Sequence, residues 1–117
     1  MSYLAIAQTA YNAIRLHTLD VSKNCIPLEK WEAIPVIEQK LWILKAKVFY
    51  SNHNKTVLEK HNLWVEQATN LGWKNGKMDT QKMYYPTLVS YDKLNGLDAF
   101  NELLFEDICE SMAYLLG

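Results

Sequence analysis

The chain of 117 residues carries twelve basic and thirteen acidic side chains, which gives a net charge of −1. Half of the residues are apolar, so the chain can bury a core, and its length fits a single domain over residues 1–117. Nucleic-acid-binding proteins usually present a dense basic stripe, whereas the lysines here are interleaved with acids. We therefore expect no nucleic-acid partner.

The sequence also predicts a cytoplasmic protein without a membrane partner. Its apolar runs fall far short of the ~20 residues that span a bilayer. The N-terminal stretch contains Gln8, Thr9 and Asn12 and lacks the basic segment of a signal peptide. Cys25 and Cys109 show neither a disulfide framework nor a metal spacing, which favours two reduced thiols.

The first expected helix spans about residues 3–17, because Leu4, Ala7, Tyr11 and Ile14 recur at helical spacing. Residues 20–27 are typical of a loop, and residues 28–34 predict one short helical turn that Pro35 stops.

The second expected helix, residues 35–51, begins with Pro35, which suits a first turn. It carries two adjacent apolar stripes, formed by Ile37, Leu41, Leu44 and Val48 and by Trp42, Ala46 and Phe49. So wide an apolar face predicts either a central helix or one shared with a partner subunit in a homodimer.

The boundaries of the third helix are the clearest. Thr56 and Glu59 fit a capping box, and Gly72 fits the left-handed residue after the last turn. Trp73 follows where a hydrophobic contact back to the helix is expected.

Residues 73–95 predict an irregular stretch with a minor β element. Asn75-Gly76 is a type I′ turn signal, and Thr87–Tyr91 is β-prone, although Pro86 limits it to an edge or a strand start. A fourth helix is expected over about residues 97–116. The predicted fold is therefore mainly α, with four helices.

The chain lacks the usual signatures of an enzyme, a metal site or a cofactor site. His17, His53 and His61 stand apart from each other and from cysteines, and the four glycines are scattered. Carboxylate pairs such as Glu106 and Glu110 share a helix face, for which a solvated surface is the favoured interpretation. We expect no catalytic residues, no metal and no cofactor.

Arg15, its neighbour Tyr11 and several other aromatic residues are the candidates for ligand binding. Arg15 lies one helical turn after Tyr11, and its guanidinium suits phosphate or carboxylate; the alternative is a surface arginine paired with Asp20. Several rings lie outside the aliphatic stripes: Trp31, Trp64, Trp73, Tyr84, Tyr85 and Tyr91. They either plug the edge of the core or form a stacking pocket with Lys77 and Lys82.

Three ordered segments resemble the ryanodine-receptor domain, whose pattern is roughly H-x-x-W, seven residues, G-W-x-Y-G, then h-P-x-L-V-P-Y-x-x-L. Here they are His61–Trp64, Gly72–Gly76 and Tyr85–Leu94, with Asn75, Tyr85 and Ser90 departing from the pattern. The N-terminal half, from Ile6-Ala7 to Arg15 and from Trp31 to Pro35, is similar to small stand-alone members from bacteria and phages.

The resemblance covers nearly the whole chain and implies a compact α-rich domain with two loosely similar halves. It also implies a non-enzymatic module for an adenine-nucleotide-like signal, acting as a sensor or a sponge in phage–bacteria defence. On this hypothesis Trp31, Trp73, Tyr85 or Tyr91 would stack on the base, while Arg15, with Lys77 or Lys82, would meet phosphate. The alternative hypothesis is a protein–protein or self-association module without a small ligand.

Overall fold

The structure, a computed structural model, describes residues 2–21 and 28–116. Within them lie four α-helices, two short 3₁₀ helices and one pair of two-residue strands. In chain order these are α1 (Tyr3–Val21), η1 (Trp31–Ala33), α2 (Val36–Ser51), α3 (Val57–Asn70), β1 (Lys74–Asn75), β2 (Tyr84–Tyr85), η2 (Tyr91–Lys93) and α4 (Gly96–Leu116). The prediction of a mainly α fold with a minor β element is confirmed.

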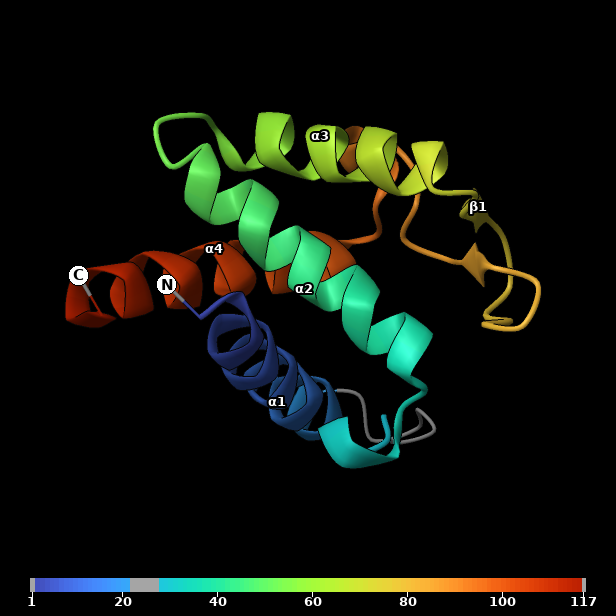
Figure 1. The fold of residues 1–117 in the computed structure, drawn as a ribbon, viewed down its shortest axis with the longest axis horizontal. Helices are drawn as coiled ribbons and strands as arrows, with labels where there is room; N and C mark the ends of the chain where they lie inside the picture. The colour runs from blue at the N-terminus through green and yellow to red at the C-terminus, as the bar shows by residue number, and fades with distance from the viewer. Residues whose placement is uncertain (1, 22–27, 117) are drawn as a thin grey trace.

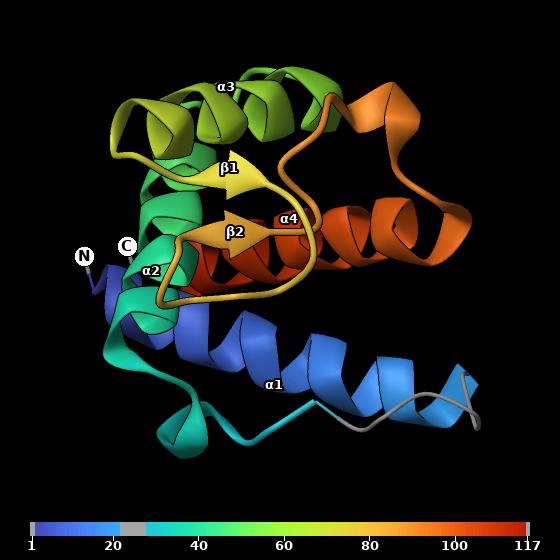
Figure 2. The same cartoon turned by 90° about the vertical axis from the view of Figure 1, so that its right-hand side faces the viewer.

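Helix α2 is the centre of the molecule and contacts α1, α3 and α4 (Figures 1 and 2). Residues from both of its predicted stripes are buried, among them Leu41, Trp42, Ala46, Val48 and Phe49. The three surrounding helices therefore account for its wide apolar face, as expected of a central helix.

Two predicted boundaries near the N-terminal half differ from the structure. Helix α1 continues to Val21, beyond the expected end at His17, so the loop predicted from residue 20 was wrong at residues 20 and 21. The rest of that prediction, residues 22–27, lies outside the described residues. The short turn predicted over residues 28–34 is the 3₁₀ helix η1, and Pro35 is the N-cap of α2.

The two halves of the chain repeat one order of elements. In each half a long helix precedes a 3₁₀ helix, and a second long helix begins after two intervening residues. The extended backbone before η1 (φ −63°, ψ 154° at Lys30) matches that before η2 (φ −59°, ψ 148° at Ser90). The segments Trp31–Pro35 and Tyr91–Asn95 also share an aromatic–acidic–x–aliphatic order, which supports the prediction of loosely similar halves.

Both predicted ends of α3 are confirmed. Thr56 and Glu59 form the capping box, with the Glu59 amide donating to Thr56 Oγ1 at 3.2 Å. Gly72 has φ +104°, and the amide of Trp73 donates to the carbonyl of Ala68 at 3.1 Å. This bond, together with that from the Gly72 amide to the Thr69 carbonyl, is the pairing of a Schellman motif, and it turns the chain toward the core.

The strand prediction was wrong in position and type. Strands β1 and β2 are parallel, with Lys74 opposite Tyr84, so Asn75-Gly76 does not form a hairpin turn. The β-prone segment Thr87–Tyr91 is not a strand, because the chain turns directly after β2, where the Leu88 amide donates to the Tyr85 carbonyl and the Leu88 side chain is buried. Pro86 also removes a donor that a ladder would need.

Within the described ranges, every helix is too short or too polar to cross a membrane. The same residues contain no cluster of three His, Cys, Asp or Glu side chains placed to hold a metal ion.

Candidate functional site

Four of the aromatic residues predicted to bind the ligand lie in the core. Tyr11, Trp31, Trp73 and Tyr85 are 2%, 5%, 3% and 6% exposed, respectively. The Tyr11 and Trp31 rings pack edge to face with centroids 5.6 Å apart, and Trp73 and Tyr85 do the same at 5.9 Å. A base could not stack on these rings without displacing another side chain, so the packing favours the alternative that they seal the core.

The hydroxyl groups of the two buried tyrosines are also occupied. Tyr11 donates to the carbonyl oxygen of Glu29 at 2.5 Å, and Tyr85 donates to Oε2 of Glu38 at 3.0 Å. Burial raises the pKa of Tyr11 to about 12 and holds that of Tyr85 well above its usual value. Both groups therefore stay protonated and serve as internal donors.

The predicted cationic residues lie in different places. Arg15 is half-buried on α1, and its Nε atom, although shielded from solvent, has no hydrogen-bond partner among the described residues. Lys77 and Lys82 are exposed and line an open groove of about 470 Å³ in the loop between the strands, whereas Trp73 lines a different cavity of about 180 Å³. The lysines and the tryptophan thus do not share a cavity.

Tyr91 stands apart from the other predicted rings. It is half-buried at the start of η2, where its ring centroid lies 5.9 Å from that of His61. The eight predicted ligand residues therefore do not converge on one open cleft, and their roles in ligand binding stay predictions.

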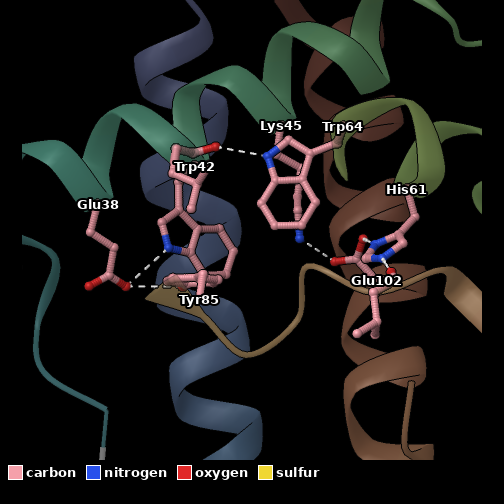
Figure 3. A network of polar contacts seen from close by, with 9 residues as sticks. Glu38, Trp42, Lys45, His61, Trp64, Tyr85 and Glu102 are labelled. Atoms are coloured by element: carbon pink, nitrogen blue, oxygen red, sulfur yellow. Dashed lines mark hydrogen bonds and ion pairs between the residues drawn. The ribbon is translucent and has the colours of Figure 1, made fainter. Parts of the chain in front are cut away.

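A buried charged cluster joins α2, α3 and α4 (Figure 3). Lys45 of α2 pairs with Oε1 of Glu102 on α4, and His61 of α3 places Nδ1 2.6 Å from Oε2 of the same carboxylate. All three side chains are buried, and the Lys45 ammonium lies 4.0 Å from the centroid of the Trp64 ring. Burial alone would raise the pKa of Glu102, but Lys45 and His61 lower it below its ordinary range.

The charged groups of this cluster pair with one another and have little access to solvent. A second buried carboxylate, Glu38, accepts from Tyr85 and, at 3.4 Å, from Trp42 Nε1, and burial raises its pKa (Figure 3). His61 of the first group contacts the Val89 carbonyl and Glu38 of the second contacts Tyr85, so both groups connect helices to the 73–95 stretch. Neither presents a reactive atom to an open surface.

A larger cavity lies where the end of α2, the start of α3 and the last turns of α4 meet. Its volume is about 510 Å³. It is lined by Phe49, Tyr50, Ser51, His53, Lys60, Cys109, Glu110 and Ala113. We call this the Lys60 cavity. Its size falls in the range of small-molecule sites in proteins, roughly 300–1,000 Å³.

Lys60 gives the cavity its most distinctive chemistry. The side chain is only 1% exposed, and its ammonium group lies 5.9 Å from the centroid of the Phe49 ring. Oε2 of Glu106 lies 2.9 Å from Nζ, and Oε1 of Glu110 lies 3.8 Å from it. The cavity thus combines a buried cation with aromatic walls, since Tyr50 lines it as well.

The buried thiol of Cys109 acts as part of the wall. Burial raises its pKa to about 11, so the thiolate needed for nucleophilic or metal chemistry is scarce near neutral pH.

Sequence reasoning missed the Lys60 cavity. Its lining residues come from three helices and from the turn between α2 and α3. The spacing of Glu106 and Glu110 predicts a solvated face and does not reveal the lysine opposite. The usable signal was the isolated Lys60 on the buried side of α3, in register with His61 and Trp64.

Comparison of this chain with known protein families, with curated proteins and with solved structures finds no match. The resemblance to the ryanodine-receptor domain therefore rests on the motifs quoted above, and its functional implications stay predictions.

Proposed function

We propose that the protein is a non-enzymatic module that binds a small anionic ligand with a planar ring, of the nucleotide class, in the Lys60 cavity. The observation that carries the proposal is a cavity of about 510 Å³ that combines a buried ammonium group with aromatic side chains. An aromatic wall suits a base, and a desolvated cation suits phosphate or carboxylate.

The lining supplies both kinds of contact. Tyr50 is half-buried and offers a ring at the wall, while exposed His53 lies at the same cavity. Lys60 offers an ammonium group whose burial strengthens its interaction with an anion. The residues that would bind the ligand are therefore Tyr50, His53 and Lys60.

The proposal keeps the adenine-nucleotide class but moves its site away from the rings predicted from the sequence. A module that binds such a molecule without converting it would act as a sensor or a sponge for a nucleotide-derived signal. Recovery of the unchanged ligand after incubation with the protein, followed by mass spectrometry, tests the absence of turnover.

A thermal-shift panel of AMP, ADP, ATP, ADP-ribose and cyclic nucleotides tests binding. A ligand at 100 times its Kd should stabilise the fold by about 2.7 kcal/mol. Absence of a shift across the panel, supported by calorimetry at high ligand concentration, would contradict the proposal.

A matched pair of variants locates the site. Ala113→Leu adds side-chain volume inside the cavity, whereas Ser111→Leu makes a similar addition at an exposed position of the same helix that is not part of the lining. We expect Ala113→Leu to weaken binding at least tenfold, a loss of about 1.4 kcal/mol, and Ser111→Leu to leave the affinity unchanged. Equal affinity in both variants would place the ligand elsewhere.

Self-association is the second candidate function, and one exposed apolar patch favours it. Val36, Ile37 and Leu71 are 64%, 38% and 64% exposed, and the last two line the cavity of about 180 Å³ between α2 and the end of α3. Light scattering over a concentration series tests this candidate. A concentration-dependent dimer would support it if Leu71→Asp, at the C-cap of α3, abolishes the dimer while Leu58→Asp, at an exposed leucine within α3, retains it. A monomer at every concentration would reject it.

A further inference from the structure

The two carboxylates that face Lys60 are not equivalent. Glu106 and Glu110 lie one turn apart on α4, and both point to the same ammonium group. Glu106 is 20% exposed and makes a hydrogen bond of 2.9 Å. Glu110 is 56% exposed, and its oxygen lies 3.8 Å from Nζ, beyond hydrogen-bond distance.

Glu106 by itself compensates the buried charge of Lys60. A second carboxylate is not needed for charge balance, and it leaves the local group of three with an excess negative charge. Glu110 lines the cavity, so an anion that enters to reach Lys60 also meets the Glu110 carboxylate. More than half of the Glu110 side chain is exposed, so the carboxylate has room to rotate into water at little cost.

We infer that the Glu110 carboxylate occupies the place of the ligand's anionic group beside Lys60 and competes with it, so that Glu110 sets how strongly the cavity accepts anions. The inference rests on the proposed function, because it concerns the same cavity. On this inference Glu110 determines specificity. Its carboxylate disfavours weakly bound anions and is displaced only by a ligand that also contacts the aromatic wall.

Calorimetric titration with AMP and with its uncharged parent adenosine tests the inference. Glu110→Gln keeps the shape of the side chain and removes the competing charge. Asp107→Asn removes one negative charge from an exposed position of the same helix outside the lining. It controls for the general electrostatic effect of losing a negative charge near the cavity. We expect Glu110→Gln to raise the affinity for AMP by about two- to fivefold, the range of an exposed charge pair, and to leave the affinity for adenosine unchanged.

The possible outcomes are distinct. A gain for AMP that exceeds that of Asp107→Asn, and that shrinks as salt is added, supports the inference. Equal or weaker AMP binding by Glu110→Gln overturns the inference, yet binding by the wild type then still supports the proposed function. If neither the wild type nor Glu110→Gln binds AMP, the inference is overturned, and the proposed function fails with it only if the whole nucleotide panel is also negative.

Discussion

His61 places Nδ1 2.6 Å from Oε2 of Glu102 and Nε2 2.8 Å from the carbonyl oxygen of Val89. A backbone carbonyl only accepts, so Nε2 carries a hydrogen, and the carboxylate also accepts when ionised. One ring therefore ties α3 both to α4 and to the segment that leads into η2. Because Glu102 also pairs with Lys45, the same carboxylate connects α4 to the central helix.

Removal of either Lys45 or Glu102 should destabilise the fold strongly. Removal of Glu102 leaves the Lys45 ammonium group buried without a carboxylate, and removal of Lys45 leaves Glu102 with only His61. Breaking a buried charge pair in this way usually costs about 3–5 kcal/mol. We expect losses of this size for Lys45→Met and for Glu102→Gln in urea unfolding at pH 7. Lys47→Met, two residues along α2 at an exposed position, is the control and should stay within about 0.5 kcal/mol of the wild type.

The contribution of Glu102 should also depend on pH. Its pKa in the folded protein lies below the ordinary value of 4.5, so its stabilisation is fully present above pH 4.5 and is lost as the pH falls through the folded value. The difference in unfolding free energy between wild type and Glu102→Gln should therefore narrow between pH 7 and pH 3. A constant difference over this range would mean that the ionised carboxylate is not the stabilising species.

Glu38 should show the opposite pH dependence. Burial raises its pKa above 4.5, so its favourable contribution is present below that pH and is lost as the pH rises through the folded value. Glutamine does not titrate, and its amide oxygen accepts from Tyr85 and Trp42 as the carboxylate does. Glu38→Gln should therefore gain stability relative to wild type between pH 4 and pH 8. A loss of stability that grows as the pH rises would contradict this expectation and show that the two hydrogen bonds need the ionised carboxylate.

Gly72 should resist substitution, whereas Gly96 should tolerate it. At φ +104° an alanine is strained at Gly72 although its added methyl group would meet Met83 only at ordinary contact distance. We expect Gly72→Ala to cost at least about 1 kcal/mol. At Gly96, the first residue of α4, a methyl group meets nothing within 4 Å, so Gly96→Ala should be neutral or slightly stabilising. Thermal unfolding of both variants beside the wild type measures the two effects.

The features that could be predicted from the sequence are those set by neighbouring residues. The capping box at Thr56 and the left-handed Gly72 depend on contacts within one or two helical turns, and the structure has both. The pair of Lys45 and Glu102 spans 57 positions, and no local pattern reports it. The same holds for the Lys60 cavity, whose walls come from three helices and the turn between α2 and α3.

Trp73 shows why the ligand residues were harder to predict. Its position directly after Gly72 predicted a contact back to the helix, and its place in an irregular stretch also allowed a role in ligand binding. The ring is 3% exposed, so the first interpretation describes its packing. The motif residues His61 and Trp64 are likewise buried, and the Trp64 indole donates to the Leu41 carbonyl at 3.1 Å, so this part of the motif specifies packing.

Loss of the N-cap at Thr56 should cost a measurable part of the stability of α3. Thr56 Oγ1 accepts the Glu59 amide, and in return the Glu59 carboxylate accepts the Thr56 amide at 3.3 Å, which lowers the pKa of Glu59. Thr56→Ala should therefore destabilise the protein by about 1 kcal/mol in urea unfolding. Thr69, an exposed threonine of the same helix, donates to the Val65 carbonyl within the helix, so Thr69→Ala loses no cap and gains helix propensity. If the two variants were equally stable, the capping box would not be what fixes the start of α3.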